Sequence, residues 1–204
     1  MPRPATGRTP WARTSVLLAL VVSLSACTES STPAESRAAS VSYAAPDRVA
    51  GSADPLATGT RIHRVHGRLP DPRRKDVRRD VGRVVDRWWE ASYLGGTYPR
   101  TSFPDAFPGF TRGATRVARS DKALLTNQTD GARITSVTPR KRSIAIDILA
   151  VGGRARSVTA HFVLRFDTTG DKTGTTTARG RLFLTRHHGP WRVFGYDVAK
   201  WRRA

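Results

Sequence analysis

The feature that most limits the possible folds of this chain is a change in its hydrophobic period. From about residue 132 onward, apolar and polar residues alternate, which is typical of β-strands that bury one face. The alternation is clearest over 144–150 and 158–166, and Gly152-Gly153 between them has the residues of a two-residue hairpin turn. Shorter segments with the same period begin near residues 134, 182 and 191. We therefore predict an antiparallel meander of four to five strands.

Before the meander, the apolar residues have the spacing of a helix. Asp71-Pro72 resembles a helix start and Gly95-Gly96 a helix end, so we predict a helix over 72–94. We expect one of the adjacent residues Trp88 and Trp89 to face the core and the other to lie at its rim. The stripe on one side of the helix consists of Val77, Val81, Val84, Val85 and Trp88.

Between the helix and the meander, we predict a loop over 95–112 that places three phenylalanines on the core. A short helix is expected over 113–125, with Val117, Leu124 and Leu125 facing inward. The stripe of the first helix and the apolar face of the sheet each need a cover in water. We expect the stripe to lie against Ile146, Phe162 and Leu164.

The last predicted strand carries a resemblance to a known family. Its residues, Gly189-Pro190-Trp191-Arg192-Val193 followed by Phe194 to Val198, resemble the final strand of many nuclear transport factor 2-like proteins, also called the cystatin-like cone fold. The element order over about 72–200 is also similar. The resemblance implies an α+β domain over 72–204, in which N-terminal helices pack on a curved antiparallel sheet of four to five strands.

The N-terminus has the layout of a secretory signal peptide over residues 1–26. Three arginines precede an apolar run over 15–24, which is too short for a membrane-spanning helix. Leu24-Ser25-Ala26-Cys27 resembles the lipobox of bacterial lipoproteins. The resemblance implies cleavage between Ala26 and Cys27, lipidation of Cys27, and an extracytoplasmic location on the outer face of the cytoplasmic membrane. The alternative is an ordinary signal peptide with a chance cysteine.

Two segments separate this signal from the predicted domain. Residues 27–60 are rich in Ser, Thr, Ala, Pro and Gly, so we expect a disordered tether. Residues 61–71 are predicted to be a basic extended arm, which faces lipid headgroups or solvent. Its basic and histidine residues are Arg61, His63, Arg64, His66 and Arg68.

The chain is strongly basic, with a formal net charge of +19. Loss of residues 1–26 removes three arginines and no acidic residue, which leaves +16. Such a field favours anionic lipid headgroups or wall polymers as partners. An unidentified envelope protein is a further candidate partner, and export argues against nucleic acid. The alternative is that the charge reflects compositional bias, since arginine greatly outnumbers lysine.

Some members of the resembled superfamily are isomerases, cyclases and dehydratases with acid–base residues in the cone. The corresponding candidates here are Asp147, His161, Asp197, Tyr93 and Tyr98. However, Asp147 and His161 alternate with the apolar residues of their strands, so we expect both to point away from the helices. No catalytic residue is therefore predicted.

The sequence also predicts no metal site and no cofactor. Adjacent residues of a strand point to opposite faces, so His187 and His188 are not expected to bind one ion. His63 and His66 could share an ion only on a helix, and their segment is predicted to be extended. Two short basic clusters, Arg73-Arg74-Lys75 and Arg140-Lys141-Arg142, are assigned to contacts with an anionic surface.

These observations favour a surface-anchored lipoprotein with a non-catalytic binding or accessory domain whose ligand is unknown. One alternative is a cone-fold enzyme of the isomerase or cyclase type, and another is an electrostatic adaptor to anionic lipid or wall polymer. An enclosed pocket with a polar pair of residues would favour the enzyme. A cone filled by the protein's own Phe and Trp side chains would favour the binding domain.

The lipobox yields a direct prediction. Cys27→Ala should abolish the incorporation of labelled fatty acid and move the protein to the soluble fraction, because only the cysteine thiol can form the thioether. Metabolic labelling followed by membrane fractionation measures both effects. The lipoprotein interpretation is wrong if the wild type takes up no label and the variant stays on the membrane unprocessed.

Overall fold

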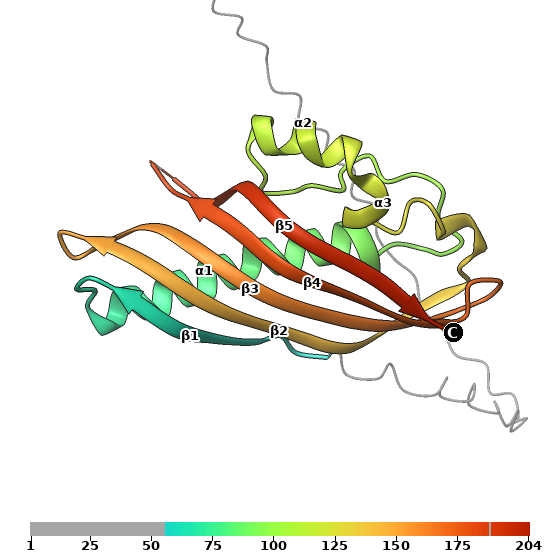
Figure 1. The fold of residues 1–204 in the computed structure, drawn as a ribbon, viewed down its shortest axis with the longest axis horizontal. Helices are drawn as coiled ribbons and strands as arrows, with labels where there is room; N and C mark the ends of the chain where they lie inside the picture. The colour runs from blue at the N-terminus through green and yellow to red at the C-terminus, as the bar shows by residue number, and fades with distance from the viewer. Residues whose placement is uncertain (1–55, 188) are drawn as a thin grey trace, which may run out of the picture. The chain divides into compact units, whose positions relative to one another are not determined.

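The computed structural model describes residues 56–187 and 189–204 (Figure 1). The predicted signal peptide, Cys27 and the tether up to residue 55 lie outside the described residues, as does His188. The strands are β1 (Gly59–His66), β2 (Ser136–Val151), β3 (Arg154–Thr169), β4 (Gly174–Thr185) and β5 (Arg192–Arg203). The helices are α1 (Asp71–Trp89), the π-helix η1 (Glu90–Leu94), α2 (Arg112–Ser120), α3 (Lys122–Leu125) and the 3-10 helix η2 (Gly131–Arg133).

The fold class is α+β, with one five-stranded sheet in the order β1-β2-β3-β4-β5. Strands β2 to β5 form the predicted antiparallel meander, but β1 pairs with β2 in parallel. The sheet is therefore mixed, and the prediction of a wholly antiparallel sheet is wrong. Parallel neighbours need a long crossover, which the segment from α1 to η2 provides here.

Strand β1 also changes the domain boundary. The predicted basic arm over 61–71 is extended up to His66, as expected, but it is a strand of the sheet. Gly59 and Thr60, assigned to the tether, pair with Ser143 and Ile144 of β2. The folded domain therefore begins before residue 61. Ile62 and Val65 pack against the core, and their apolar contacts fix the segment on the sheet.

The meander matches its prediction at the first hairpin and differs in β2. Gly152 and Gly153 have φ of +59° and +69°, as a turn of type I′ requires. The two strands predicted over 134–138 and 144–150 are one continuous strand. A register shift between Pro139 and Lys141 allows pairing with β3 to continue through the polar residues between them.

The stripe of α1 contacts the sheet as expected. The ring centroids of Trp88 and Phe162 are 5.3 Å apart in an edge-to-face arrangement, and all five stripe residues are buried. The expectation that Trp88 or Trp89 lies at the rim is wrong, because both are fully buried. Trp89 also packs on Phe162, with 6.0 Å between ring centroids, and the guanidinium of Arg142 lies 5.7 Å from its ring.

The predicted short helix is divided into α2 and α3 at Asp121. Leu125 is fully buried, as expected, but Val117 is 56% exposed. The buried face of α2 consists of Ala114 and Ala118 instead. Tyr196 of β5 donates a hydrogen bond to Asp121 Oδ2 (2.7 Å), and this bond fixes the junction of the two helices on the sheet.

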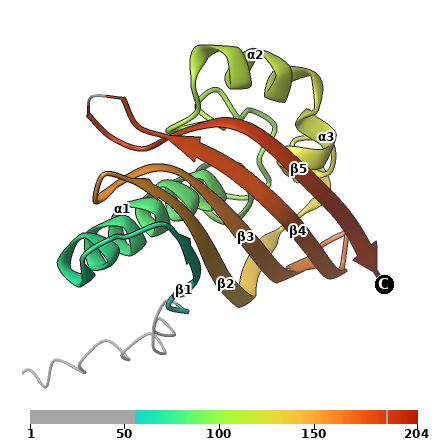
Figure 2. The ribbon, with the colours of Figure 1, turned by 60° about the vertical axis from the view of Figure 1, so that its left-hand side comes forward.

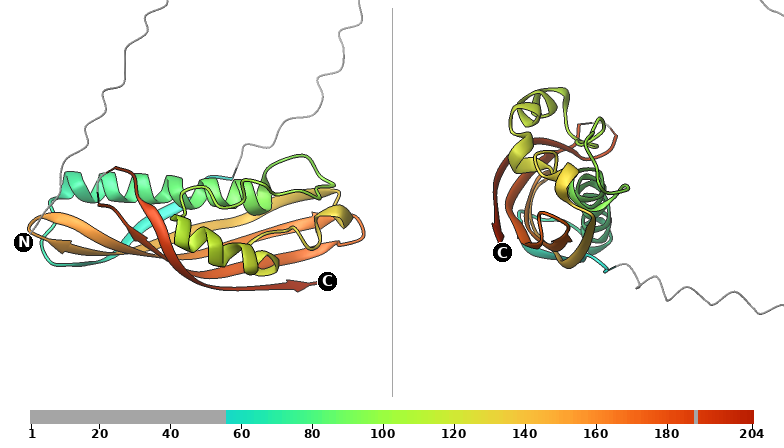
Figure 3. Two further views of the ribbon diagram at one scale, coloured as in Figure 1. Left: turned by 90° about the horizontal axis from the view of Figure 1, so that it is seen from above. Right: turned by 90° about the vertical axis from the view of Figure 1, so that its right-hand side faces the viewer.

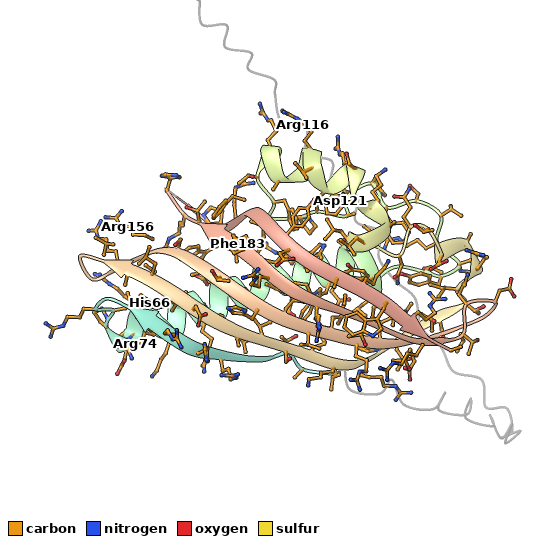
Figure 4. The ribbon with its side chains drawn as sticks, in the orientation of Figure 1. His66, Arg74, Arg116, Asp121, Arg156 and Phe183 are labelled. Carbon is orange, nitrogen blue, oxygen red and sulfur yellow. The ribbon has the colours of Figure 1, made fainter. Side chains whose placement is uncertain are left out.

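Helix α1 lies along one face of the twisted sheet (Figures 2 and 3). Among the described residues, no helix covers the opposite face, which we call the open face. Phe183, labelled in Figure 4, lies on the open face, with the guanidinium of Arg181 5.8 Å from its ring.

The packing of α1 predicts a large difference between neighbouring substitutions. Trp88→Ala should lower the free energy of unfolding by about 3–5 kcal/mol, because it removes a fully buried indole. Arg87→Ala should change it by less than about 0.5 kcal/mol, because Arg87 is exposed. Urea unfolding followed by circular dichroism measures both values. Wild-type stability in Trp88→Ala would contradict the core position of this residue.

Candidate functional site

The space between α1 and the sheet, where a cone-fold enzyme would bind its substrate, is occupied by the protein's own aromatic side chains. Trp88, Trp89, Tyr93, Phe162 and Phe166 pack there in a connected series of ring contacts. All five are at most 2% exposed. An interior filled in this way was expected for a binding domain.

Two of the candidate acid–base residues have structural hydrogen bonds in this interior. The hydroxyl of Tyr93 donates to the carbonyl of Leu124 (2.8 Å), and that of Tyr98 donates to the carbonyl of Tyr93 (2.7 Å). Asn127 also donates to the Tyr93 carbonyl (3.0 Å). Burial raises the pKa of both tyrosines, so both hold their protons at neutral pH.

The other candidates lie on the open face. Asp147 accepts hydrogen bonds from two histidines, His63 Nδ1 at Oδ1 (2.7 Å) and His161 Nε2 at Oδ2 (3.0 Å). The prediction that Asp147 and His161 point away from the helices is confirmed. His63 was expected on a basic arm that faces headgroups or solvent, and its contact with Asp147 was not predicted, because it depends on the parallel pairing of β1. Asp197 lies further along this face and binds Arg181.

This cluster is partly exposed to solvent and lies outside any enclosed cavity between α1 and the sheet. The side chains of His63 and His161 are 46% and 42% exposed. Burial alone would raise the pKa of Asp147, but the hydrogen bonds from His63 and His161 outweigh it and lower the pKa. Among residues 56–187 and 189–204, no group of three or more His, Cys, Asp and Glu residues is arranged to hold a metal ion.

A basic cavity of about 510 Å³ lies at the end of the domain where α1 begins and the β2–β3 hairpin turns. Asp76 and Asp80 contribute carboxylates to its wall, and both pair with Arg79. Arg73, Arg154, Arg156 and Arg186 have no carboxylate partner among the described residues. The lining residues are Leu69, Arg73, Asp76, Val77, Arg79, Asp80, Arg154, Ala155, Arg156, Arg186 and His187.

A second cavity, of about 460 Å³, adjoins the first, and Asp80 and Arg186 belong to both walls. Arg186 extends across this boundary, with its guanidinium 5.2 Å from the ring of Trp191. We call the two cavities together the arginine groove. The second cavity is lined by Asp80, Arg83, Val84, Asp86, Arg87, Arg186, Gly189, Pro190 and Trp191.

The groove forms where three separate segments meet. Arg73 of α1 donates a hydrogen bond to the carbonyl of Gly153, which fixes the β2–β3 turn against the helix. Arg79, Arg83 and Arg87 recur every four residues along α1, so they lie in one row beside the buried stripe. Arg156 lies at the hairpin end of the sheet in Figure 4, far from Arg116 on α2.

The two basic clusters of the sequence do not form continuous patches. Of the first, Arg73 lines the groove, whereas Arg74 donates to the carbonyl of Leu69 (2.8 Å). Of the second, Arg140 binds Asp167 on the open face, whereas Arg142 lies beside Trp89. The groove residues Arg154, Arg156 and Arg186 were not identified from the sequence, since they lie in different segments and form no motif.

Comparison of the chain with known proteins found no matching family model, no matching curated protein and no matching solved structure. The part of the chain that the structure describes contains no helix that is both long and apolar enough to span a membrane.

The cluster on the open face predicts a pH-dependent contribution to stability. Because the pKa of Asp147 is lowered in the folded state, the unfolded chain takes up the proton first as the pH falls. The contribution is therefore present above about pH 3.9 and is lost as the pH falls through the lowered folded pKa. Asp147→Asn should cost about 1 kcal/mol or less at pH 6, and this cost should shrink toward pH 2.5.

Urea unfolding of both proteins across this pH range measures the difference. Asp171→Asn is the matched control, because Asp171 is exposed and has no hydrogen bond or ion pair among the described residues. A cost for Asp147→Asn that is the same at pH 6 and pH 2.5 would contradict the role of its charge.

Proposed function

We propose that this chain is a bacterial lipoprotein, anchored through Cys27 to the outer face of the cytoplasmic membrane, whose folded domain is a non-catalytic binding domain for anionic ligands. The N-terminal signal and lipobox support the anchor. For the domain, we propose the curved, cone-like form of the nuclear transport factor 2-like fold. The order of its elements and the position of α1 along the sheet support this assignment.

The arginine groove is the observation that carries the binding function. Four guanidinium groups from α1, the β2–β3 hairpin and the segment after β4 line one cavity without a carboxylate partner among the described residues. Uncompensated like charges repel one another, so an anion between them would relieve the repulsion and accept charge-assisted hydrogen bonds. The overall positive charge would also attract such a ligand from a distance.

The two alternatives have weaker support. The enzyme alternative requires an acid–base pair in an enclosed pocket, whereas Asp147 and His161 lie on the open face. The alternative of a purely electrostatic adaptor requires only net charge, and it predicts no preference for the groove over other basic surfaces. The property to test is therefore whether an anion binds more tightly in the groove than on the other basic surfaces of the domain.

Inorganic pyrophosphate is a suitable probe for this test. In the unlipidated chain from residue 28 to 204, it should shift the amide NMR signals of residues 153–156 and 186–187. The double variant Arg154→Gln/Arg156→Gln should weaken binding about tenfold or more, because hydrogen bonds to charged groups contribute about 1.5–3 kcal/mol each. Sodium chloride at equal ionic strength corrects for general screening.

The matched control is Arg112→Gln/Arg116→Gln, which removes the same charge from α2. Neither arginine has a hydrogen bond or ion pair among the described residues, so the fold should be unaffected. The control should bind pyrophosphate within about twofold of the wild type. Equal losses in both double variants would support the electrostatic adaptor instead, and the absence of any shift would contradict the binding function.

A further inference from the structure

The arginine groove has two chemically different ends. At the hairpin end, Arg73, Arg154 and Arg156 surround a small apolar floor formed by Leu69, Val77 and Ala155. At the other end, Val84, Pro190 and Trp191 form an apolar wall, flanked by arginines of α1. A ligand that fills the whole groove therefore has one strongly anionic part joined to one apolar part.

We infer that the arginine groove binds a single anionic phospholipid, with the phosphate at the hairpin end and the first part of an acyl chain against Trp191. This inference rests on the proposed function, which places the domain at the membrane surface, and it names the ligand of the same site. A phosphate group suits the hairpin end because its oxygens match the planar fork of a guanidinium, and several guanidiniums can share it.

Arg186 connects the two ends of this site. It lines both cavities of the groove, and its guanidinium lies 5.2 Å from the ring of Trp191. An arginine in this position can contact a phosphate while its aliphatic part and the indole bury hydrocarbon. Trp191 itself is only 2% exposed, so the core holds it in place, and the exposed Pro190 beside it provides accessible apolar surface.

The carboxylates of the groove do not oppose this assignment. Asp80 binds Arg79 (3.0 Å) and Arg83, and Asp86 binds Arg142 (3.0 Å). Asp76 binds Arg79 (3.0 Å). These acidic groups are thus compensated by arginines on α1 and β2, whereas the arginines of the hairpin end are not.

The inference predicts a preference for the amphiphile over its headgroup. A short-chain phosphatidylglycerol, used below its micelle concentration, should bind the unlipidated chain at least about tenfold more tightly than glycerophosphoglycerol, its deacylated form with the same charge, because burial of the acyl chain adds to phosphate binding. Arg154→Gln/Arg156→Gln should weaken binding of this lipid about tenfold, and Arg112→Gln/Arg116→Gln less than about twofold. A short-chain phosphatidylcholine tests the need for net negative charge and should bind at least about tenfold more weakly.

Fluorescence quenching locates the acyl chain. A phosphatidylglycerol with a brominated acyl chain should quench the tryptophan emission of the wild type. Trp191→Phe should remove most of this quenching, whereas Trp201→Phe should retain it, since Trp201 lies on the open face beside Arg179. Quenching that depends on Trp201 instead would place the lipid on the open face and overturn the inference.

The outcomes also separate this inference from the proposed function. If pyrophosphate binds in the groove but glycerophosphoglycerol binds as tightly as the lipid, the ligand is a phosphorylated headgroup or wall polymer, and the phospholipid inference is wrong. If neither pyrophosphate nor the lipid binds in the groove, the proposed function fails as well.

Discussion

The contact between α1 and the sheet is the interaction on which the rest of the structure depends. Trp88 and Trp89 both pack on Phe162, and the ring contacts continue through Tyr93 to Phe166. Without this cover, the apolar face of a sheet with long strands would be in contact with water. The same contact fills the interior, and it thereby moves any ligand site to the periphery of the helix–sheet interface, where the arginine groove lies.

Arg142 provides a second constraint, at the border of this core. Its side chain is only 10% exposed, and it donates to Thr58 Oγ1 (2.9 Å), Asp86 Oδ1 (3.0 Å) and Glu90 Oε1 (2.7 Å). A buried cation is tolerated when its donors are satisfied in this way. These bonds join the start of the described chain, the end of α1 and the middle of β2, and they cover Trp89.

The positive charge of the chain is distributed unequally. On the open face, Arg140 and Arg181 are neutralised by Asp167 and Asp197. On α1, Arg79 and Arg83 share the carboxylate of Asp80. Among the described residues, arginines without a carboxylate partner also occur on other surfaces, such as Arg112 and Arg116 on α2. The groove differs from these surfaces because four such guanidinium groups from separate segments line one cavity.

The sequence by itself determined the main features of α1 and of the central strands. The spacing of Val77 to Trp88 set the buried side of α1, and strand parity set the directions of Asp147 and His161, because both patterns depend only on neighbouring residues. Tertiary structure decided the rest. The parallel pairing of β1 brought His63 to Asp147, although 84 residues separate them, and the Arg73–Gly153 bond closed one end of the groove across 80 residues. Such contacts depend on the register between distant segments, which is fixed only when the whole core packs.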